Sequence, residues 1–132
     1  MPDVAVRSVV SFYAPTKLTS LYETSGSKRY VEAMMLPYIG GAPLRYSDRY
    51  DLLSPVRHVK ATVPPTITLH GESDRVVPAE QAALLDEALE EYGVRHETYY
   101  FPWADHGFDA VWGSFATQAA RDKVRAFLQK HG

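Results

Sequence analysis

Residues 64–78 read PPTITLHGESDRVVP, and this stretch predicts how the middle of the chain folds. Residues 66–69 are β-branched or apolar and directly follow two prolines, which a strand admits at its first residue. His70 and Gly71 begin a polar loop. Pro78 can occupy the first turn of a helix, where its missing N–H costs nothing. The stretch therefore predicts a strand, a loop and the start of a helix.

Strands and helices are expected to alternate along the rest of the chain. A helix is expected from Pro78 to Gly93, because apolar residues recur at helical spacing and the glycine supplies a stop. Residues 96–101 predict an aromatic-rich strand, and residues 117–130 predict a closing amphipathic helix. Residues 4–12 carry valine on both faces, as in a strand buried between helix layers. This order indicates an α/β protein with a short, mainly parallel sheet flanked by helices.

The segment between the first and second strands has no clear periodicity. Residues 16–43 mix glycine, serine, proline and tyrosine around one stretch of helical character, residues 28–36. We expect an irregular segment there, with one helix.

Composition and charge exclude several classes of protein. A formal net charge of −2, from 14 Lys and Arg against 16 Asp and Glu, offers no broad positive field to nucleic acid or anionic lipid. The absence of cysteine excludes thiol catalysis, disulfides and cysteine-ligated metal. No secretion signal opens the sequence, and no apolar run approaches the roughly 20 residues that cross a bilayer. We therefore expect a soluble, cytoplasmic protein with neither nucleic-acid nor membrane partners.

Two loops that follow predicted strands each contain one residue suited to acid–base chemistry. In open parallel sheets, ligands bind beyond the carboxyl ends of the strands, which directs attention to residues 70–78 and 102–108. The second loop contains His106, and histidine is the natural base near neutral pH. The first loop contains Asp74, whose carboxylate could accept a ring N–H of His106 and fix its tautomer. We expect the two side chains to meet at the same edge of the sheet.

Several motifs, in this order along the chain, resemble the C-terminal part of α/β-hydrolase esterases and their prolyl-oligopeptidase-like relatives. The main two are HGxxDxxVP at residues 70–78 and PxxxHGF at residues 102–108. Upstream, YIGG at residues 38–41 and SPVxxV at residues 54–59 resemble the segment before the acid's strand in small esterases that act on acyl or acetyl esters. FYxP at residues 12–15 resembles the strand after the nucleophile's helix. The resemblance covers nearly the whole chain.

The resemblance implies a partial α/β-hydrolase fold, with residues 1–132 as the C-terminal portion of the domain and residues 16–45 as a variable insertion. The family's catalytic triad runs serine, acid, histidine along the chain, so Asp74 becomes the acid and His106 the base. Neither Gly-x-Ser-x-Gly nor a His-Gly-Gly-like oxyanion loop occurs here, and the resemblance places both before Met1. The implied reaction is hydrolysis of a small-molecule carboxylic ester through an acyl-enzyme, without cofactor or metal.

Other interpretations remain open. The nearest enzymatic alternative is a serine peptidase of the prolyl-oligopeptidase type. From a different class, a non-catalytic fragment or self-associating interaction module could retain Asp74 and His106 from an enzymatic ancestor. Ser73 superficially imitates a nucleophile elbow, but Arg75 occupies the place of its second glycine. A metal site built from Asp105, His106 and Asp109 is also conceivable.

The remaining histidines have structural interpretations. We expect His70 to be a packed, hydrogen-bonded neighbour of the acid loop, and we expect His58, His96 and His131 to lie at the surface. The other serines have no better context than Ser73 for a nucleophile.

The expected first strand also predicts association. Residues 4–12 contain neither proline nor lysine, the residues that commonly discourage pairing at a sheet edge. If no strand precedes it, this strand offers unpaired N–H and C=O groups to a second chain. We expect a homo-oligomer formed through this N-terminal strand edge.

Overall fold

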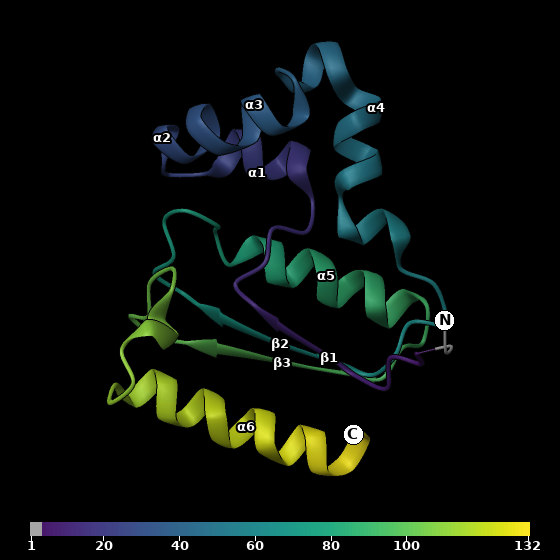
Figure 1. Ribbon diagram of the computed structural model, residues 1–132, viewed down its shortest axis with the longest axis vertical. Coiled ribbons are helices and arrows are strands. Elements are labelled where there is room, and N and C mark those ends of the chain that lie inside the picture. Colours follow the sequence, from purple (N-terminus) through teal and green to yellow (C-terminus); the bar gives the residue numbers. More distant parts are fainter. Residues whose placement is uncertain (1–3) are drawn as a thin grey trace.

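The computed structural model describes residues 4–132 and contains a parallel sheet of three strands, in the order β1-β2-β3 (Figure 1). The strands are β1 (Val9–Phe12), β2 (Thr66–Gly71) and β3 (His96–Phe101). Val9 of β1 lies opposite Thr66 of β2, which in turn lies opposite His96 of β3. This register aligns the carboxyl ends of β2 and β3, the two strands that precede the expected site loops.

Two helices cover the two faces of the sheet (Figure 1). One face packs against α6 (Phe115–His131), where Ile67 and Leu69 of β2 share a core cluster with Phe127. The other face lies beside α5 (Glu80–Glu91), whose apolar residues cluster with valines of the segments that precede β2 and β3. All six residues of β2 are buried, because side chains that alternate across a strand meet a helix on either face.

A separate helical lobe lies between β1 and β2 in the chain and stacks above α5 (Figure 1). It begins with α1 (Leu18–Thr24) and ends with the short 3-10 helix η2 (Pro55–His58). The elements between them are α2 (Lys28–Tyr30), the π-helical turn η1 (Val31–Met35), α3 (Leu36–Ile39) and α4 (Pro43–Leu53). The lobe has its own core, built from side chains of α1, η1, α3 and α4 together with Val77 of the acid loop. This last contact joins the lobe core to the site.

A buried polar network attaches the lobe to α5. The side-chain oxygen of Gln81 accepts the backbone N–H groups of Thr16 and Lys17 at 2.9 and 2.8 Å. Within the lobe itself, the Ser54 hydroxyl accepts the N–H of Leu18 at 2.9 Å. Gln81, Thr16 and Ser54 are all almost wholly buried, so these bonds satisfy backbone groups that water cannot reach.

The structure confirms four of the expected elements and corrects two, the helix at residues 28–36 and the strand at residues 4–12. β2, β3, α5 and α6 occur where the sequence predicts strands and helices, with ends that differ by about two residues. The expected helix at residues 28–36 continues, with its π-helical turn, as far as Ile39. The expectation of an irregular segment with one helix over residues 16–43 is wrong, because α1 and the start of α4 also lie within it.

The prediction of a strand over residues 4–12 is wrong in both length and burial. Residues 4–8 do not form a strand. The first bond to the sheet runs from the Val9 N–H to the Pro65 carbonyl, 2.9 Å away, because β2 itself begins only at Thr66. Residues 4–7 are exposed, and the four residues of β1 are half-buried instead of fully enclosed. Over the described residues, β1 pairs on one side only, with β2.

No helix within residues 4–132 has the length and apolar character needed to cross a membrane.

Candidate active site

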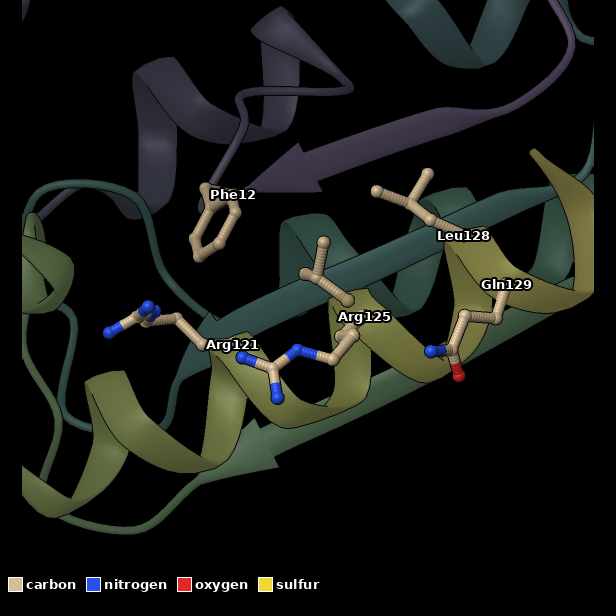
Figure 2. Close-up of a pocket in the computed structure, with 6 residues that line it drawn as sticks. Phe12, Arg121, Arg125, Leu128 and Gln129 are labelled. Carbon is tan, nitrogen blue, oxygen red and sulfur yellow. The ribbon is translucent and has the colours of Figure 1, made fainter.

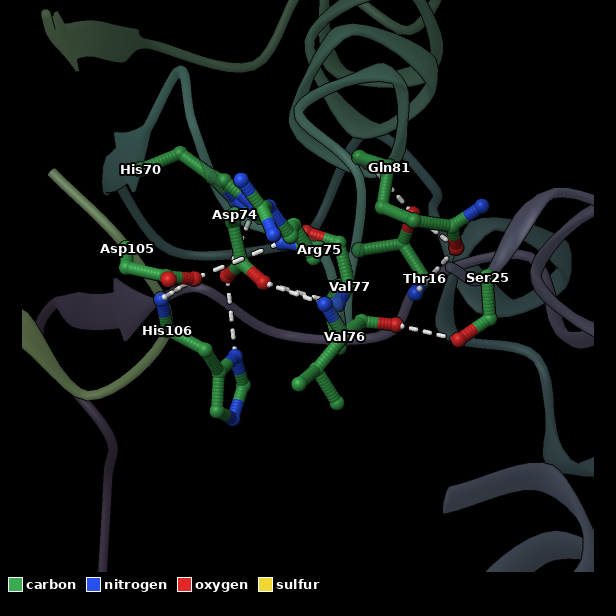
Figure 3. Close-up of polar contacts among 10 residues, drawn as sticks. All are labelled: Thr16, Ser25, His70, Asp74, Arg75, Val76, Val77, Gln81, Asp105 and His106. Atoms are coloured by element: carbon green, nitrogen blue, oxygen red, sulfur yellow. Dashed lines mark hydrogen bonds and ion pairs between the residues drawn. The ribbon is translucent and has the colours of Figure 1, made fainter. Parts of the chain in front are cut away.

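The two loops beyond β2 and β3 bring Asp74 and His106 together (Figure 3). The Nδ1 atom of His106 lies 2.8 Å from Oδ2 of Asp74. A carboxylate oxygen in this contact accepts, so Nδ1 carries the proton and Nε2 is left as a free acceptor. The Asp74 side chain is completely buried, whereas 32% of the His106 side chain is exposed. The pair therefore presents a base to solvent, backed by a buried acid.

The acid loop folds around the carboxylate of Asp74. Its second oxygen, Oδ1, accepts the backbone N–H groups of Val76 and Val77 at 3.0 and 2.9 Å. These bonds satisfy the oxygen that His106 does not use, as a buried carboxylate requires. Asp74 therefore has one oxygen fixed by its own loop and the other directed at the histidine.

The acid loop, which follows β2 and carries Asp74, is joined directly to the histidine loop, which follows β3 and carries His106. The Glu72 N–H donates to the Phe101 carbonyl, and the Ser73 N–H donates to the Ala104 carbonyl, both at 3.0 Å. Gly71 permits this close approach, because a Cβ at that position would collide with the Ala104 carbonyl. The distance between acid and base is therefore set by backbone contacts.

His70 packs beside Asp74 and is a hydrogen-bonded neighbour of the acid loop, as the sequence predicts. It is fully buried, and its Nε2 lies 2.7 Å from the Val77 carbonyl oxygen and 3.5 Å from Oδ2 of Asp74. Both oxygens accept, so Nε2 carries the proton. Burial lowers the pKa of His70, and Nδ1, the other ring nitrogen, is buried without a hydrogen-bond partner among the described residues. His70 is therefore a neutral ring with a fixed tautomer.

Asp105 and Asp109 accept hydrogen bonds from other groups. They do not form the metal site with His106 that the sequence left open. Oδ1 of Asp105 accepts the backbone N–H of His106 at 2.7 Å, and Asp109 accepts the Tyr13 hydroxyl. Within residues 4–132, no group of three or more His, Asp or Glu side chains is arranged to hold a metal ion. Of the other histidines, His96 pairs with Asp86 at 3.3 Å and keeps only 19% of its side chain exposed, so it is less superficial than expected.

Sequence reasoning missed Tyr13 as a site residue. Its ring centroid lies 4.5 Å from that of His106, and its hydroxyl donates to Oδ1 of Asp109 at 2.8 Å. Burial, together with Asp109, raises the pKa of Tyr13 above its usual value. The only signal in the sequence is an aromatic residue at a strand end, and the partners lie more than 90 residues away.

Ser73 lies on the exposed side of the acid loop, where its backbone N–H bonds to Ala104. Across the described chain, no serine hydroxyl bonds to the His106 ring; Ser25 instead donates its hydroxyl to the Val76 carbonyl at 2.7 Å. The lobe thus contacts Val76, two residues after Asp74. The site has an acid and a base, with no serine in contact with the base.

A parallel sheet whose adjacent strands bring an aspartate and a histidine together at their carboxyl ends is part of the framework of an α/β-hydrolase, and this chain has that part of the fold. Residues 1–89 match the BD-FAE family, and the chain belongs to it.

Similar proteins agree with this assignment. The esterase LipQ of Mycobacterium tuberculosis is 31% identical over an alignment that covers 96% of this chain and 30% of LipQ. The uncharacterized peptidase YtmA of Bacillus subtilis is 29% identical over 76% of this chain and 38% of its own length. Among solved structures, esterase Est2 of Thermogutta terrifontis has a TM-score of 0.68 at 25% identity, over 98% of this chain and 47% of Est2. The chain thus spans between about a third and a half of these relatives.

Proposed function

We propose that this chain contributes the acid and base of a carboxylic-ester hydrolase that works through a Ser-Asp-His triad. Asp74 orients the imidazole, His106 moves the proton, and a serine outside these 132 residues is the nucleophile. The observation that carries the proposal is the 2.8 Å contact between a wholly buried carboxylate and a partly exposed imidazole. Two relatives from Mycobacterium tuberculosis, the esterase LipQ and the probable carboxylic ester hydrolase LipM, support the choice of ester over other substrates.

The geometry indicates the steps that these residues would perform. Nε2 of His106 accepts the proton of the serine hydroxyl as its oxygen attacks the ester carbonyl, and Asp74 stabilises the imidazolium that forms. The imidazolium then donates that proton to the departing alcohol, which leaves an acyl-enzyme. A water molecule, deprotonated by the same Nε2, attacks the acyl-enzyme; as the bond between the acyl group and the serine oxygen breaks, the imidazolium returns the proton to that oxygen and the acid is released. None of these steps requires a metal or cofactor.

A small or medium acyl group fits the similar structures best. These structures include a truncated carbohydrate esterase from gut microbiota and an acetyl ester-xyloside bifunctional hydrolase from Caldicellulosiruptor lactoaceticus. A serine peptidase is the second candidate, supported by the match to YtmA and by the fold of a puromycin-hydrolyzing peptidase of Mycobacterium tuberculosis, which has a TM-score of 0.78 at 23% identity. The same acid and base would serve either reaction.

We also propose that the free edge of β1 pairs with a second copy of the chain. Apolar hollows flank this strand on both faces. One of about 530 Å³ lies between Phe12 and the side chains of α6 (Figure 2), and one of about 320 Å³ lies beside Leu85 and Leu89 of α5. An edge strand with unfilled apolar space on both faces favours pairing with another polypeptide. The alternative to an esterase is a non-catalytic module that self-associates through the same edge of β1.

Hydrolysis of short p-nitrophenyl esters tests the proposal. We expect the 132-residue chain to be no faster than its Ser73→Ala variant, because the nucleophile and the oxyanion donors are not among its motifs. A longer product of the same gene that includes a Gly-x-Ser-x-Gly motif should turn over these esters. Robust turnover by the chain alone that Ser73→Ala abolishes would contradict the assignment of the nucleophile. Inactivity of the longer product would favour the non-catalytic module.

A further inference from the structure

The aromatic ring of Tyr13 lies against the imidazole of His106, although the two residues come from opposite ends of the chain. The ring centroids are 4.5 Å apart with planes inclined at 58°, within the range of a favourable aromatic contact. Tyr13 also contacts Phe108, whose centroid is 5.9 Å away in an edge-to-face arrangement. The tyrosine therefore packs against both the catalytic histidine and the residue two places after it.

We propose that Tyr13 is a positioning residue for His106 and that Asp109 anchors it. This inference rests on the proposed function, in which His106 is the base. Tyr13 touches no reacting atom in this role; it acts through the orientation of the imidazole.

One hydrogen bond does not fix the direction of an imidazole. The contact from Nδ1 to Asp74 defines one point of the ring, and the ring can still swing about that contact. Since Nε2 lies on the far side of the ring, such a swing moves the proton-accepting atom most. A second contact on the ring face limits this motion, and the Tyr13 ring supplies it.

The backbone and hydroxyl of Tyr13 are held at separate points. Its φ of +37° is in the left-handed region that residues other than glycine seldom adopt, and its N–H donates to the Leu69 carbonyl at 2.9 Å. Its hydroxyl donates to Oδ1 of Asp109 at 2.8 Å, three residues after His106. The tyrosine thus ties the end of β1 to the loop that carries the histidine. Asp74 and Tyr13 hold the same loop from two directions.

Solvent exchange of the His106 Hδ1 proton, observed by NMR on the ¹⁵N-labelled chain, measures this positioning directly. The proton is protected while its bond to Asp74 is closed, so its exchange rate reports how often the ring swings open. In Tyr13→Leu we expect exchange to be about two- to tenfold faster, the factor that corresponds to one aromatic pair. Tyr13→Phe keeps the ring and loses the tether, and it should show a smaller acceleration.

Variants of the anchor separate positioning from general loosening. Asp109→Ala should accelerate exchange as much as Tyr13→Phe, and the double variant should add little, because both changes break the same bond. Asp109→Asn keeps an acceptor oxygen and should restore the wild-type rate. Tyr99→Phe is the matched control. The Tyr99 hydroxyl donates to Glu97, with 2.8 Å between the two oxygens, and this bond lies away from the site. It should leave Hδ1 exchange unchanged.

Two results would overturn the inference. One is a wild-type exchange rate in Tyr13→Leu, Tyr13→Phe and Asp109→Ala. The other is an equal acceleration in Tyr99→Phe, which would show that the rate follows overall stability. Either result leaves the proposed function standing, because that function is tested by ester turnover and not by Hδ1 exchange.

Discussion

Nε2 of His70 lies 2.7 Å from the carbonyl oxygen of Val77, closing the loop that holds Asp74. The histidine comes from the buried strand β2 and the valine from the end of the acid loop. The bond requires a proton on Nε2, and burial, which lowers the pKa of His70, favours the neutral ring with its proton there.

The first prediction concerns pH and follows from His70. Because its folded pKa lies below the unfolded value of about 6.5, the unfolded chain takes up the proton first as pH falls. The contribution of His70 to stability is therefore fully present above about pH 6.5 and is lost as pH falls below it. We expect the free energy of unfolding, measured in urea, to decrease between about pH 7 and pH 5.5.

His70→Gln removes the titrating group and keeps a donor near Nε2, so it should flatten this dependence. His58→Gln is the control, since His58 is exposed and should leave the slope unchanged. A slope in His70→Gln equal to that of the wild type would show that another group is responsible.

The second prediction concerns the attachment of the lobe. Gln81→Leu is close in volume but leaves the N–H groups of Thr16 and Lys17 without their acceptor. Each unsatisfied buried donor costs about 1–3 kcal/mol, so we expect the loss of both bonds to lower the free energy of unfolding by about 2–6 kcal/mol. The exposed Gln118 provides the control, because Gln118→Leu should change stability by less than about 0.5 kcal/mol. Equal effects of the two substitutions would refute the structural role of Gln81.

The third prediction concerns the contact between the acid loop and the histidine loop. Gly71→Ala would place a Cβ against the Ala104 carbonyl, so the loops must separate, at a cost of about 1–3 kcal/mol. Gly113→Ala is the matched control, since open space surrounds that position. Chemical denaturation gives the stability, and the Hδ1 resonance of His106 reports whether the contact to Asp74 survives. A Gly71→Ala variant with wild-type stability and an unchanged Hδ1 resonance would contradict the role assigned to this glycine.

The fourth prediction concerns the free edge of β1. The N–H groups of Val9 and Tyr13 bond to the β2 side, so the alternation of a parallel strand directs the N–H of Val10 to the free edge. Val10→Pro removes that donor without removing a bond to β2, and it should weaken self-association. Val4→Pro, in the exposed segment before β1, should not. Sedimentation across a dilution series checks both; a 14.8 kDa monomer at every concentration of the wild type would contradict association.

Local patterns explain why much of the fold is predictable. β2, β3, α5 and α6 each carry their own signal, such as apolar spacing or a flanking proline or glycine. The meeting of Asp74 and His106 follows from the rule that neighbouring parallel strands end at the same edge. The length of β1 was not predictable, because it depends on where its partner begins.

Features that depend on distant contacts could not be predicted. The lobe owes its shape to tertiary packing around Tyr50 and to left-handed turns at Gly40 and Gly41. Tyr13 reaches His106 and Asp109 only once the sheet has formed. Such contacts leave no periodic trace in the sequence, so Tyr13 was not predicted to contact His106.

Ester hydrolysis by a longer gene product that carries this segment together with a Gly-x-Ser-x-Gly serine tests the central assignment most directly. The measurement is kcat/KM for p-nitrophenyl acetate in the wild type, His106→Ala, Asp74→Asn and, as the control, Asp105→Asn. We expect His106→Ala and Asp74→Asn each to lower kcat/KM by about 10³-fold or more, because the imidazole loses its role or its tautomer. Asp105→Asn keeps an acceptor for the His106 N–H and should stay within about tenfold of the wild type. Turnover that survives both His106→Ala and Asp74→Asn would contradict the assignment of Asp74 and His106 as acid and base.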